Sequence, residues 1–167
     1  MSGSLFGLGL RIEAAVRRKV FVSYHHGGDQ AYYNTFSQAF HDAYDVITDN
    51  SLERAVDSGD VEYVMRRIRE DCVRSSSCTI VLVGRETHLR KYIDWEIKAT
   101  PSLPINSQGR VSVPARLSDN INTGYALWLS WADITANAHV CQRYIEVANS
   151  KDKRLIDNSR ARRLHNG

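Results

Sequence analysis

The 167-residue sequence predicts an α/β fold, a flavodoxin-like three-layer sandwich with a mostly parallel sheet. Two short apolar runs carry this prediction, Lys19 to Tyr24 (KVFVSY) and Cys78 to Val83 (CTIVLV). Both runs are rich in β-branched residues, and they stop abruptly at Ser23 and at Gly84. Strands buried on both faces have this pattern, and they usually belong to parallel sheets that helices cover on both sides. We therefore expect the two runs to be neighbouring or near-neighbouring parallel strands.

The segment between the two strands predicts helices around a short strand. Apolar residues recur three and four positions apart from Tyr32 to Ala43, one face of a helix for which Asp29 is the expected N-cap. Val46 and Ile47 form a short strand candidate, and the polar residues 48–60 predict a loop. A second amphipathic helix begins at Val61.

Beyond the second strand, helical patterns predict a helix over about Lys91 to Thr100 and a closing helix over Asn137 to Asn149. The first of these helices places Trp95 and Glu96 side by side. Most helical glutamates are solvated surface residues. Glu96, however, lies three positions from Ile93 and so borders the buried face of its helix. Open α/β sheets keep their chemistry just beyond the carboxyl ends of their strands, which makes Glu96 the foremost candidate for a functional carboxylate.

Composition indicates one globular domain, with 43% hydrophobic and 25% charged residues and a net charge of +3. We expect an N-terminal amphipathic arm over residues 1–18, the domain over residues 19–149, and a basic C-terminal tail over residues 150–167. The tail lacks interleaved aromatic residues, which favours a solvated or partner-binding end over a nucleic-acid contact. Three cysteines, an odd number with no metal-ligand spacing, and no signal peptide together indicate a reducing cytoplasm. The apolar run near the N-terminus is too short to span a membrane.

Four motifs of the chain carry a family resemblance: VFVSYHH, SSSCTIVLVG, KYIDWEI and RLSDNINTGYA. They resemble the bacterial TIR-like domain family, in particular Thoeris-type antiphage TIR proteins of the ThsB kind. The resemblance covers roughly residues 19–149 and is carried most specifically by the strand opening together with the Trp95-Glu96 pair. It implies that Glu96 corresponds to the catalytic glutamate of NAD-cleaving TIR domains, with NAD as substrate and no cofactor. It also implies self-association through TIR-like surfaces and a phage-derived trigger.

The implied chemistry suits a single carboxylate. Cleaving the bond between nicotinamide and ribose develops positive charge on the ribose, and a preorganised carboxylate stabilises that charge. Nicotinamide is a cationic leaving group, so the reaction requires no general acid. Water or another nucleophile then captures the ribosyl group, and the product, whether linear, cyclic or conjugated ADP-ribose, stays open. The alternative is a non-catalytic TIR-like interaction or sensing module. A flavodoxin-like receiver is disfavoured, because His25 and His26 replace the acidic pocket after the first strand.

The turn after the first strand is the expected nucleotide-contacting loop. Gly27 and Gly28 permit close approach of backbone N–H groups to a phosphate, while an ordinary flexible turn explains them about equally well. Ser23, Tyr24 and His25 complete the expected substrate-binding set with Trp95, although Tyr24 could equally serve packing. Adjacent histidines on a strand end point in opposite directions and no third ligand stands nearby, so we expect no metal site.

The sequence departs from the family after the helix of Glu96, where another buried strand is expected. Residues 99–104 (ATPSLP) contain no apolar run, and a proline interrupts the helix. Because deleting a central strand would expose a large apolar face, we expect residues to be missing between Thr100 and Pro101, so that these two are not neighbours in space. Ile105 to Asn122 then predicts a loop with a weak hairpin.

Overall fold

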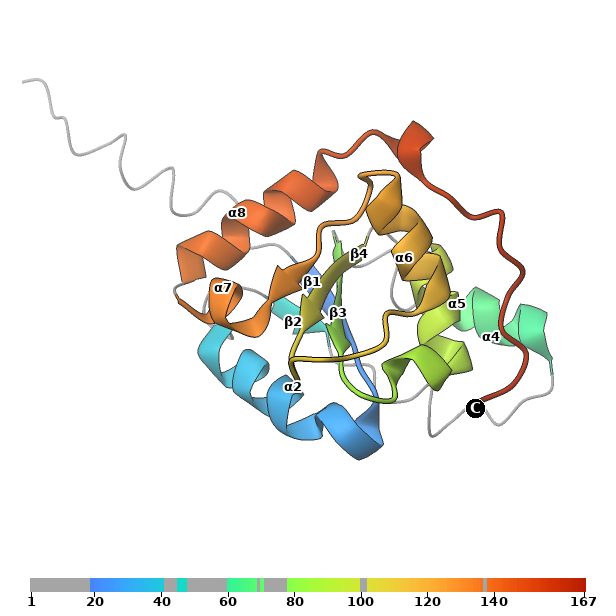
Figure 1. Ribbon diagram of the computed structural model, residues 1–167, viewed down its shortest axis with the longest axis horizontal. Helices are drawn as coiled ribbons and strands as arrows, with labels where there is room; N and C mark the ends of the chain where they lie inside the picture. The colour runs from blue at the N-terminus through green and yellow to red at the C-terminus, as the bar shows by residue number, and fades with distance from the viewer. Residues whose placement is uncertain are drawn as a thin grey trace, which may run out of the picture.

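A five-stranded, all-parallel sheet in the order β2-β1-β3-β4-β5 forms the middle layer of the molecule (Figure 1). The computed structural model describes residues 19–40, 45–47, 60–68, 70, 78–99, 102–136 and 138–167. The strands are β1 (Lys19–Ser23), β2 (Asp45–Ile47), β3 (Cys78–Val83), β4 (Ser102–Asn106) and β5 (Leu129–Ser130). The helices are α2 (His26–Phe40), α4 (Val61–Ile68), α5 (Lys91–Ala99), α6 (Ala115–Asn122), α7 (Trp131–Thr135) and α8 (Ala138–Asn149), with 3-10 turns η3 (Thr87–Leu89) and η4 (Lys153–Leu155).

The predicted pairing of the two apolar strands is confirmed. β1 and β3 are adjacent and parallel, with Val20 opposite Cys78 and Val22 opposite Ile80. Every residue of β3 is buried, as expected for a strand covered on both faces. The predicted α/β architecture is therefore the observed one.

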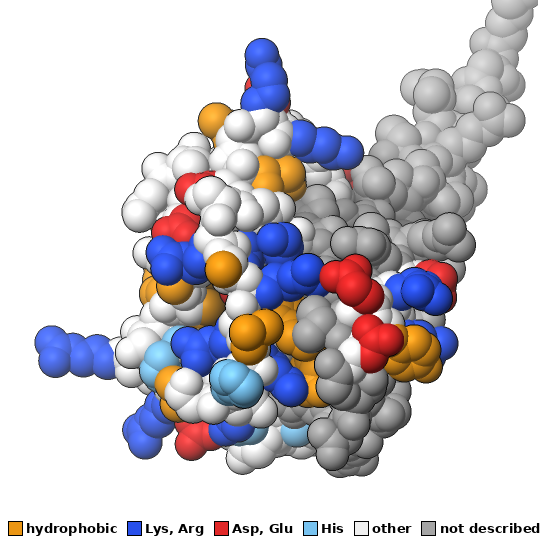
Figure 2. All heavy atoms as spheres, turned by 90° about the vertical axis from the view of Figure 1, so that its right-hand side faces the viewer, with side chains coloured by type: hydrophobic (Ala, Val, Ile, Leu, Met, Phe, Trp, Pro, Cys, Tyr) orange, Lys and Arg blue, Asp and Glu red, His pale blue; other side chains and the backbone are white. Residues whose placement is uncertain are grey.

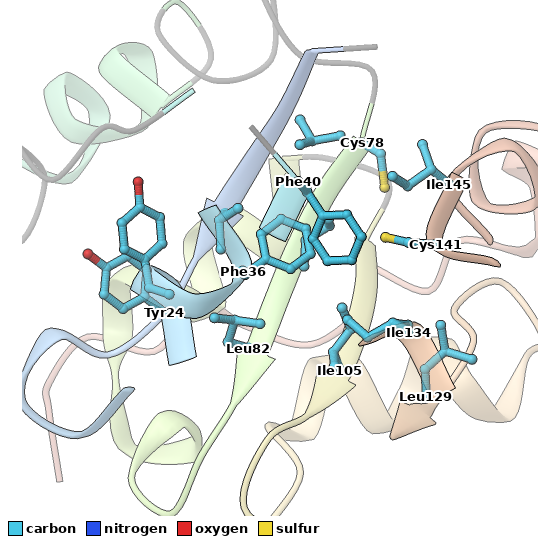
Figure 3. Packing of buried hydrophobic residues seen from close by; sticks show 14 of the residues in the cluster. Tyr24, Phe36, Phe40, Cys78, Leu82, Ile105, Leu129, Ile134, Cys141 and Ile145 are labelled. Atoms are coloured by element: carbon cyan, nitrogen blue, oxygen red, sulfur yellow. The ribbon is translucent and has the colours of Figure 1, made fainter. Parts of the chain in front are cut away.

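Helices cover both faces of the sheet (Figure 1). One face packs against α2, α7 and α8 through a core that includes Phe36, Ile134 and Ile145 (Figure 3). The other face packs against α5 and α6 through a smaller cluster that includes Ile93 and Leu117. Since β1 turns Val20 and Val22 to the first face, the alternation of the strand turns Ser23 to the second face, where α5 lies.

Two expectations about the middle of the chain are wrong. The stretch after α5 holds a core strand, β4, which lies between β3 and β5, and α6 follows within the region predicted as loop and hairpin. β4 tolerates Pro104 because β5 joins it only at Ile105 and Asn106, beyond the proline. The expected core strand after α5 is therefore present as β4, which removes the reason to expect a missing segment. Thr100 and Pro101 themselves lie outside the described residues. The predicted N-terminal arm and most of the predicted 48–60 loop also lie outside them.

The C-terminal segment, defined here as residues 157–167, lies along α5 and α6 (Figure 1). It contacts α4 through Arg162 and Glu62 and ends at η3, where the N–H of Gly167 donates a hydrogen bond to the backbone oxygen of Leu89. Its backbone exchanges hydrogen bonds with Asn120 in both directions at Asp157, with distances of 2.9 and 3.0 Å. Asn166 accepts a hydrogen bond from the backbone N–H of Lys91 and so caps the start of α5. These hydrogen bonds dock the segment on the domain, while most of its residues are exposed to solvent.

Two further observations concern the described residues only. Cys78 and Cys141 are buried thiols that lie near each other in the core (Figure 3), and burial raises the pKa of Cys78 to about 12. In the described part of the chain, no helix has the length and apolar character that a membrane span requires.

Candidate active site

The Ser23 hydroxyl donates a hydrogen bond to Oε2 of Glu96, and this contact joins the end of β1 to α5. Glu96 is only 6% exposed and Ser23 only 2%. The packing already described accounts for the contact, because the alternation of β1 turns Ser23 toward the face that α5 covers. The structure therefore brings together the predicted carboxylate and the first predicted residue of the loop.

A pocket of about 360 Å³ opens at the carboxyl edge of the sheet, in the loop that follows Ser23. We call it the switch-point pocket, since it lies where the chain leaves β1 for one face and β3 for the other, the usual ligand site of open α/β sheets. Its lining residues are His25, Gly27, Gly28, Asp29, Arg85, Glu86 and Gln108. Three of the predicted binding residues, His25, Gly27 and Gly28, thus share one pocket. Glu96 is not among the lining residues and reaches the loop through Ser23.

Gly27 and Gly28 leave room for the His25 ring, which packs against them. A Cβ on Gly27 would lie 2.9 Å from Nε2 of His25, closer than side-chain carbons approach in proteins. Gly27 and Gly28 belong to the first turn of α2, which begins at His26, three residues before the predicted N-cap. Their N–H groups therefore stand at a helix N-terminus, where anions are favoured.

Asp29 is a site residue that the sequence did not identify. Its side chain is 1% exposed, and Gln108 donates a hydrogen bond of 2.6 Å to Oδ1. A Cβ on Gly84 would lie 2.0 Å from the same oxygen, so only glycine fits there. Burial is the main cause that raises the pKa of Asp29, while the charge of His25 and the hydrogen bond from Thr87 act in the opposite direction. The Asp-Gly-Thr combination, Asp29 with Gly84 and Thr87, is distributed over 58 residues of sequence, and no local pattern signals it.

His25 is held at the rim of the pocket by two charged side chains. Its Nε2 lies 3.1 Å from Oε2 of Glu86 and 3.1 Å from Nη2 of Arg90. Arg90 also forms a hydrogen bond of 2.5 Å with Glu86, and this bond is the main cause that lowers the pKa of that carboxyl. The rim therefore carries both charge signs, which suits a ligand with a phosphate and a cationic ring.

The structure places the two remaining predicted residues elsewhere. Tyr24 belongs to the buried core (Figure 3). Its ring stacks on Tyr33, with centroids 4.4 Å apart, and its hydroxyl lies 3.2 Å from Oε1 of Gln30. Trp95 is 1% exposed and donates a hydrogen bond of 2.8 Å from Nε1 to the backbone oxygen of Arg163 in the C-terminal segment. Tyr24 therefore packs in the core, as its alternative interpretation held, and Trp95 anchors the C-terminal segment instead of lining the pocket.

Asp94 has a structural partner and does not act with Glu96. It accepts a hydrogen bond of 2.9 Å from Nε of Arg116, a side chain with no exposed surface. Within the described residues, no group of three or more His, Cys, Asp or Glu side chains is arranged to hold a metal ion.

Comparison with protein families finds a match over the part of the chain that builds this site. The model of the TIR-like domain of the Thoeris protein ThsB matches residues 21–111. The matched range contains Ser23, Asp29, Glu96 and Gln108. No curated protein matches the chain.

Proposed function

The chain belongs to the Thoeris ThsB TIR-like domain family, which indicates a role in antiphage defence, and we propose that within this role it cleaves NAD. The proposed reaction breaks the bond between nicotinamide and ribose. Nicotinamide leaves with the bonding electrons, a nucleophile adds to the ribose carbon, and the nucleophile loses a proton to solvent. The product is a signalling nucleotide of the ADP-ribose type.

The observation that carries this proposal is the buried hydrogen bond between Ser23 and Glu96 at the end of β1. A carboxylate fixed in a water-poor site stabilises the positive charge that develops on the ribose more strongly than one in water. Ser23 holds the carboxylate in place, and the N-terminal end of α2, which borders the switch-point pocket, favours the phosphates through the positive end of its helix dipole. NAD acts as the substrate, and the scheme uses no cofactor.

A second function, a non-catalytic TIR-like interaction or sensing module, is favoured by one observation. Glu96 is 6% exposed and does not line the switch-point pocket. A substrate in that pocket therefore contacts Glu96 only if the residues that cover the carboxylate move. In this alternative the Ser23–Glu96 contact only stabilises the fold. Self-association and a phage-derived trigger belong to both proposals.

Nicotinamide release separates the two functions. Purified protein is incubated with NAD, and in parallel NAD and its products are extracted from phage-infected cells that express the protein. Glu96→Gln keeps the size of the side chain and removes its charge, so we expect a rate loss on the order of a hundredfold or more. Glu62→Gln makes the same change at an exposed carboxylate on α4, away from the site, and serves as the matched control. Absence of NAD cleavage both in vitro and in infected cells would establish the non-catalytic module.

A further inference from the structure

A second pocket, of about 270 Å³, lies between η3, α5, α6 and the C-terminal segment. It shares no lining residue with the switch-point pocket. Basic side chains dominate its lining: His88, Arg90, Arg160 and Arg163. Figure 2 looks onto this side of the molecule and shows Lys, Arg and His side chains gathered there. We call it the arginine pocket.

The hydrogen-bonding groups that the arginine pocket presents are overwhelmingly donors. Its single carboxylate, Asp94, already accepts hydrogen bonds on both oxygens, from the Arg116 guanidinium and from the backbone N–H of Arg163. Arg160 holds Asp119 with two hydrogen bonds of 2.8 and 3.0 Å, which leaves further guanidinium N–H groups for another partner. The natural complement of such a lining is a small molecule that only accepts hydrogen bonds.

Three of the buried side-chain polar atoms that have no hydrogen-bond partner within the described residues lie at the same place. They are Nδ1 of His88, Nε of Arg90 and Nη1 of Arg116. The first two residues line the pocket, and Arg116 lies directly behind it, since its Nη2 bonds the backbone oxygens of Arg160 and Ala161. Buried polar atoms without partners are uncommon in folded proteins, and an ion is one of their standard explanations. The start of α6, where Ala115 borders the pocket, adds the positive end of a helix dipole.

We propose that the arginine pocket binds a phosphate group, as free phosphate or diphosphate or as the phosphate end of a nucleotide. Arginine forks match phosphate oxygens in geometry as well as in charge. The volume is smaller than the pockets that usually enclose whole drug-sized ligands, which favours a phosphate or diphosphate group over an entire dinucleotide. The bound group links Arg160 and Arg163 of the C-terminal segment to His88 and Arg90.

This linkage connects two parts of the molecule. Arg90 lines the arginine pocket, and its Nη2 lies 3.1 Å from Nε2 of His25, which lines the switch-point pocket. A phosphate group in the arginine pocket therefore fixes the C-terminal segment against α5 and biases the position of Arg90. The inference does not depend on NAD cleavage, since it concerns separate residues.

Calorimetric titration tests the proposal. Inorganic phosphate, diphosphate and ADP-ribose are titrated separately into the full chain at constant ionic strength. Arg163→Gln removes one guanidinium from the lining, and loss of a charge-assisted hydrogen bond should weaken binding by about ten- to a hundredfold. Arg162→Gln is the matched control, because it makes the same charge change one position away on a side chain that pairs with Glu62 and does not line the pocket.

The outcomes are distinct. Binding of any of the three ligands that Arg163→Gln weakens and Arg162→Gln preserves supports the proposal, and the ligand that binds most tightly identifies the source of the phosphate. Equal losses in the two variants indicate diffuse attraction to a basic surface and overturn it, as does the absence of binding by all three ligands. ADP-ribose binding that survives Arg163→Gln belongs to another site, and it overturns the proposal if neither phosphate nor diphosphate shows binding that Arg163→Gln weakens. Arg163→Lys with circular dichroism guards against misfolding, since this variant keeps the charge and should bind more tightly than Arg163→Gln.

Discussion

Ser23 and Glu96, 73 residues apart in the sequence, meet through a buried side-chain hydrogen bond at the end of β1. The contact fixes the direction of the Glu96 carboxylate, because a buried carboxylate without its donor would have to find another partner or shift. The strand end and the helix thus act together as one site. The Ser23–Glu96 hydrogen bond therefore bears on the proposed chemistry and on the packing of α5 against the sheet.

Substituting Ser23→Ala removes the donor and leaves Glu96 unchanged. If Glu96 acts in NAD cleavage, we expect the rate constant kcat to fall about ten- to a hundredfold, the value of one hydrogen bond to a charged group. The measurement is nicotinamide release at saturating NAD. Ser107→Ala is the control, since Ser107 lies at the same edge of the sheet and its hydroxyl contacts only a backbone oxygen at 3.4 Å. An unchanged kcat in Ser23→Ala would remove the positioning role of Ser23.

The close approach of Asp29 to Gly84 predicts a strong effect of a single methyl group. In Gly84→Ala the added Cβ would lie 2.0 Å from Oδ1 of Asp29, and Gln108 holds that carboxylate in place. We expect a loss of about 1–3 kcal/mol in the free energy of unfolding, measured by urea denaturation. The same substitution in an Asp29→Ala background should cost clearly less, because the clashing group is gone. Equal costs in the two backgrounds would show that the clash is not the cause.

Burial of Asp29 makes the stability of the protein depend on pH. The pKa of Asp29 is raised in the folded state above its ordinary value of 3.8, so the folded protein holds this proton more tightly than the unfolded chain. The stabilisation from that proton is complete below the unfolded pKa and is lost as the pH rises through the folded pKa. Asp29→Asn cannot ionise, and its stability relative to wild type should therefore increase between about pH 4 and pH 7. Urea denaturation across this range measures the difference, and a difference that is constant with pH would contradict the assignment to Asp29.

The sequence predicted the elements whose signals are local and missed those that depend on tertiary contacts. β1 and β3 are continuous apolar runs, and α5 is rich in apolar residues, so the sequence predicts these three elements in their observed places. β4 was missed because a five-residue strand that contains Pro104 has almost no periodicity to detect. α6 was missed because its residues, ARLSDNIN, include several weak helix formers, and its stability comes from the burial of Arg116 and Leu117.

The same distinction holds for the site. The sequence predicts the loop at His25, Gly27 and Gly28 because it follows the end of a strand, the position where parallel sheets bind ligands, and the structure gathers these three residues in one pocket. The role of Glu96 stays a prediction. The sequence predicts only a helix N-cap for Asp29. Its contacts with Thr87 and Gln108 leave no local pattern, because these partners come from other loops. The docking of the C-terminal segment relies largely on backbone oxygens and asparagine side chains, which leave no hydrophobic signal in the sequence.

The buried pair of Arg116 and Asp94 should be more important for stability than the surface ion pairs. Arg116→Met fills similar space but leaves Asp94 buried without its guanidinium, which predicts a loss of about 3–5 kcal/mol in the free energy of unfolding. Asp94 keeps the N–H of Arg163, so the lower part of this range is expected. Thermal and urea denaturation measure the change. Arg154→Met, at an exposed pair with Asp152, is the control and should leave the midpoint unchanged.

The C-terminal segment should bury Trp95 and hold α5 together. Truncation after Ile156 removes the acceptor of the Trp95 indole N–H and the Asn166 side chain that caps Lys91. Loss of the cap alone costs about 0.5–2 kcal/mol, and exposure of the Trp95 ring adds to it. We expect a lower unfolding midpoint and a red-shifted emission of Trp95, recorded in a Trp128→Phe, Trp131→Phe background so that one tryptophan remains. Asn166→Ala isolates the cap and should lower the midpoint without shifting the emission, whereas His165→Ala, at an exposed neighbour, should do neither. If the truncated chain kept both its midpoint and the emission maximum of the full chain, the segment would contribute nothing to the position of α5, and the contacts at Trp95 and Lys91 would be incidental.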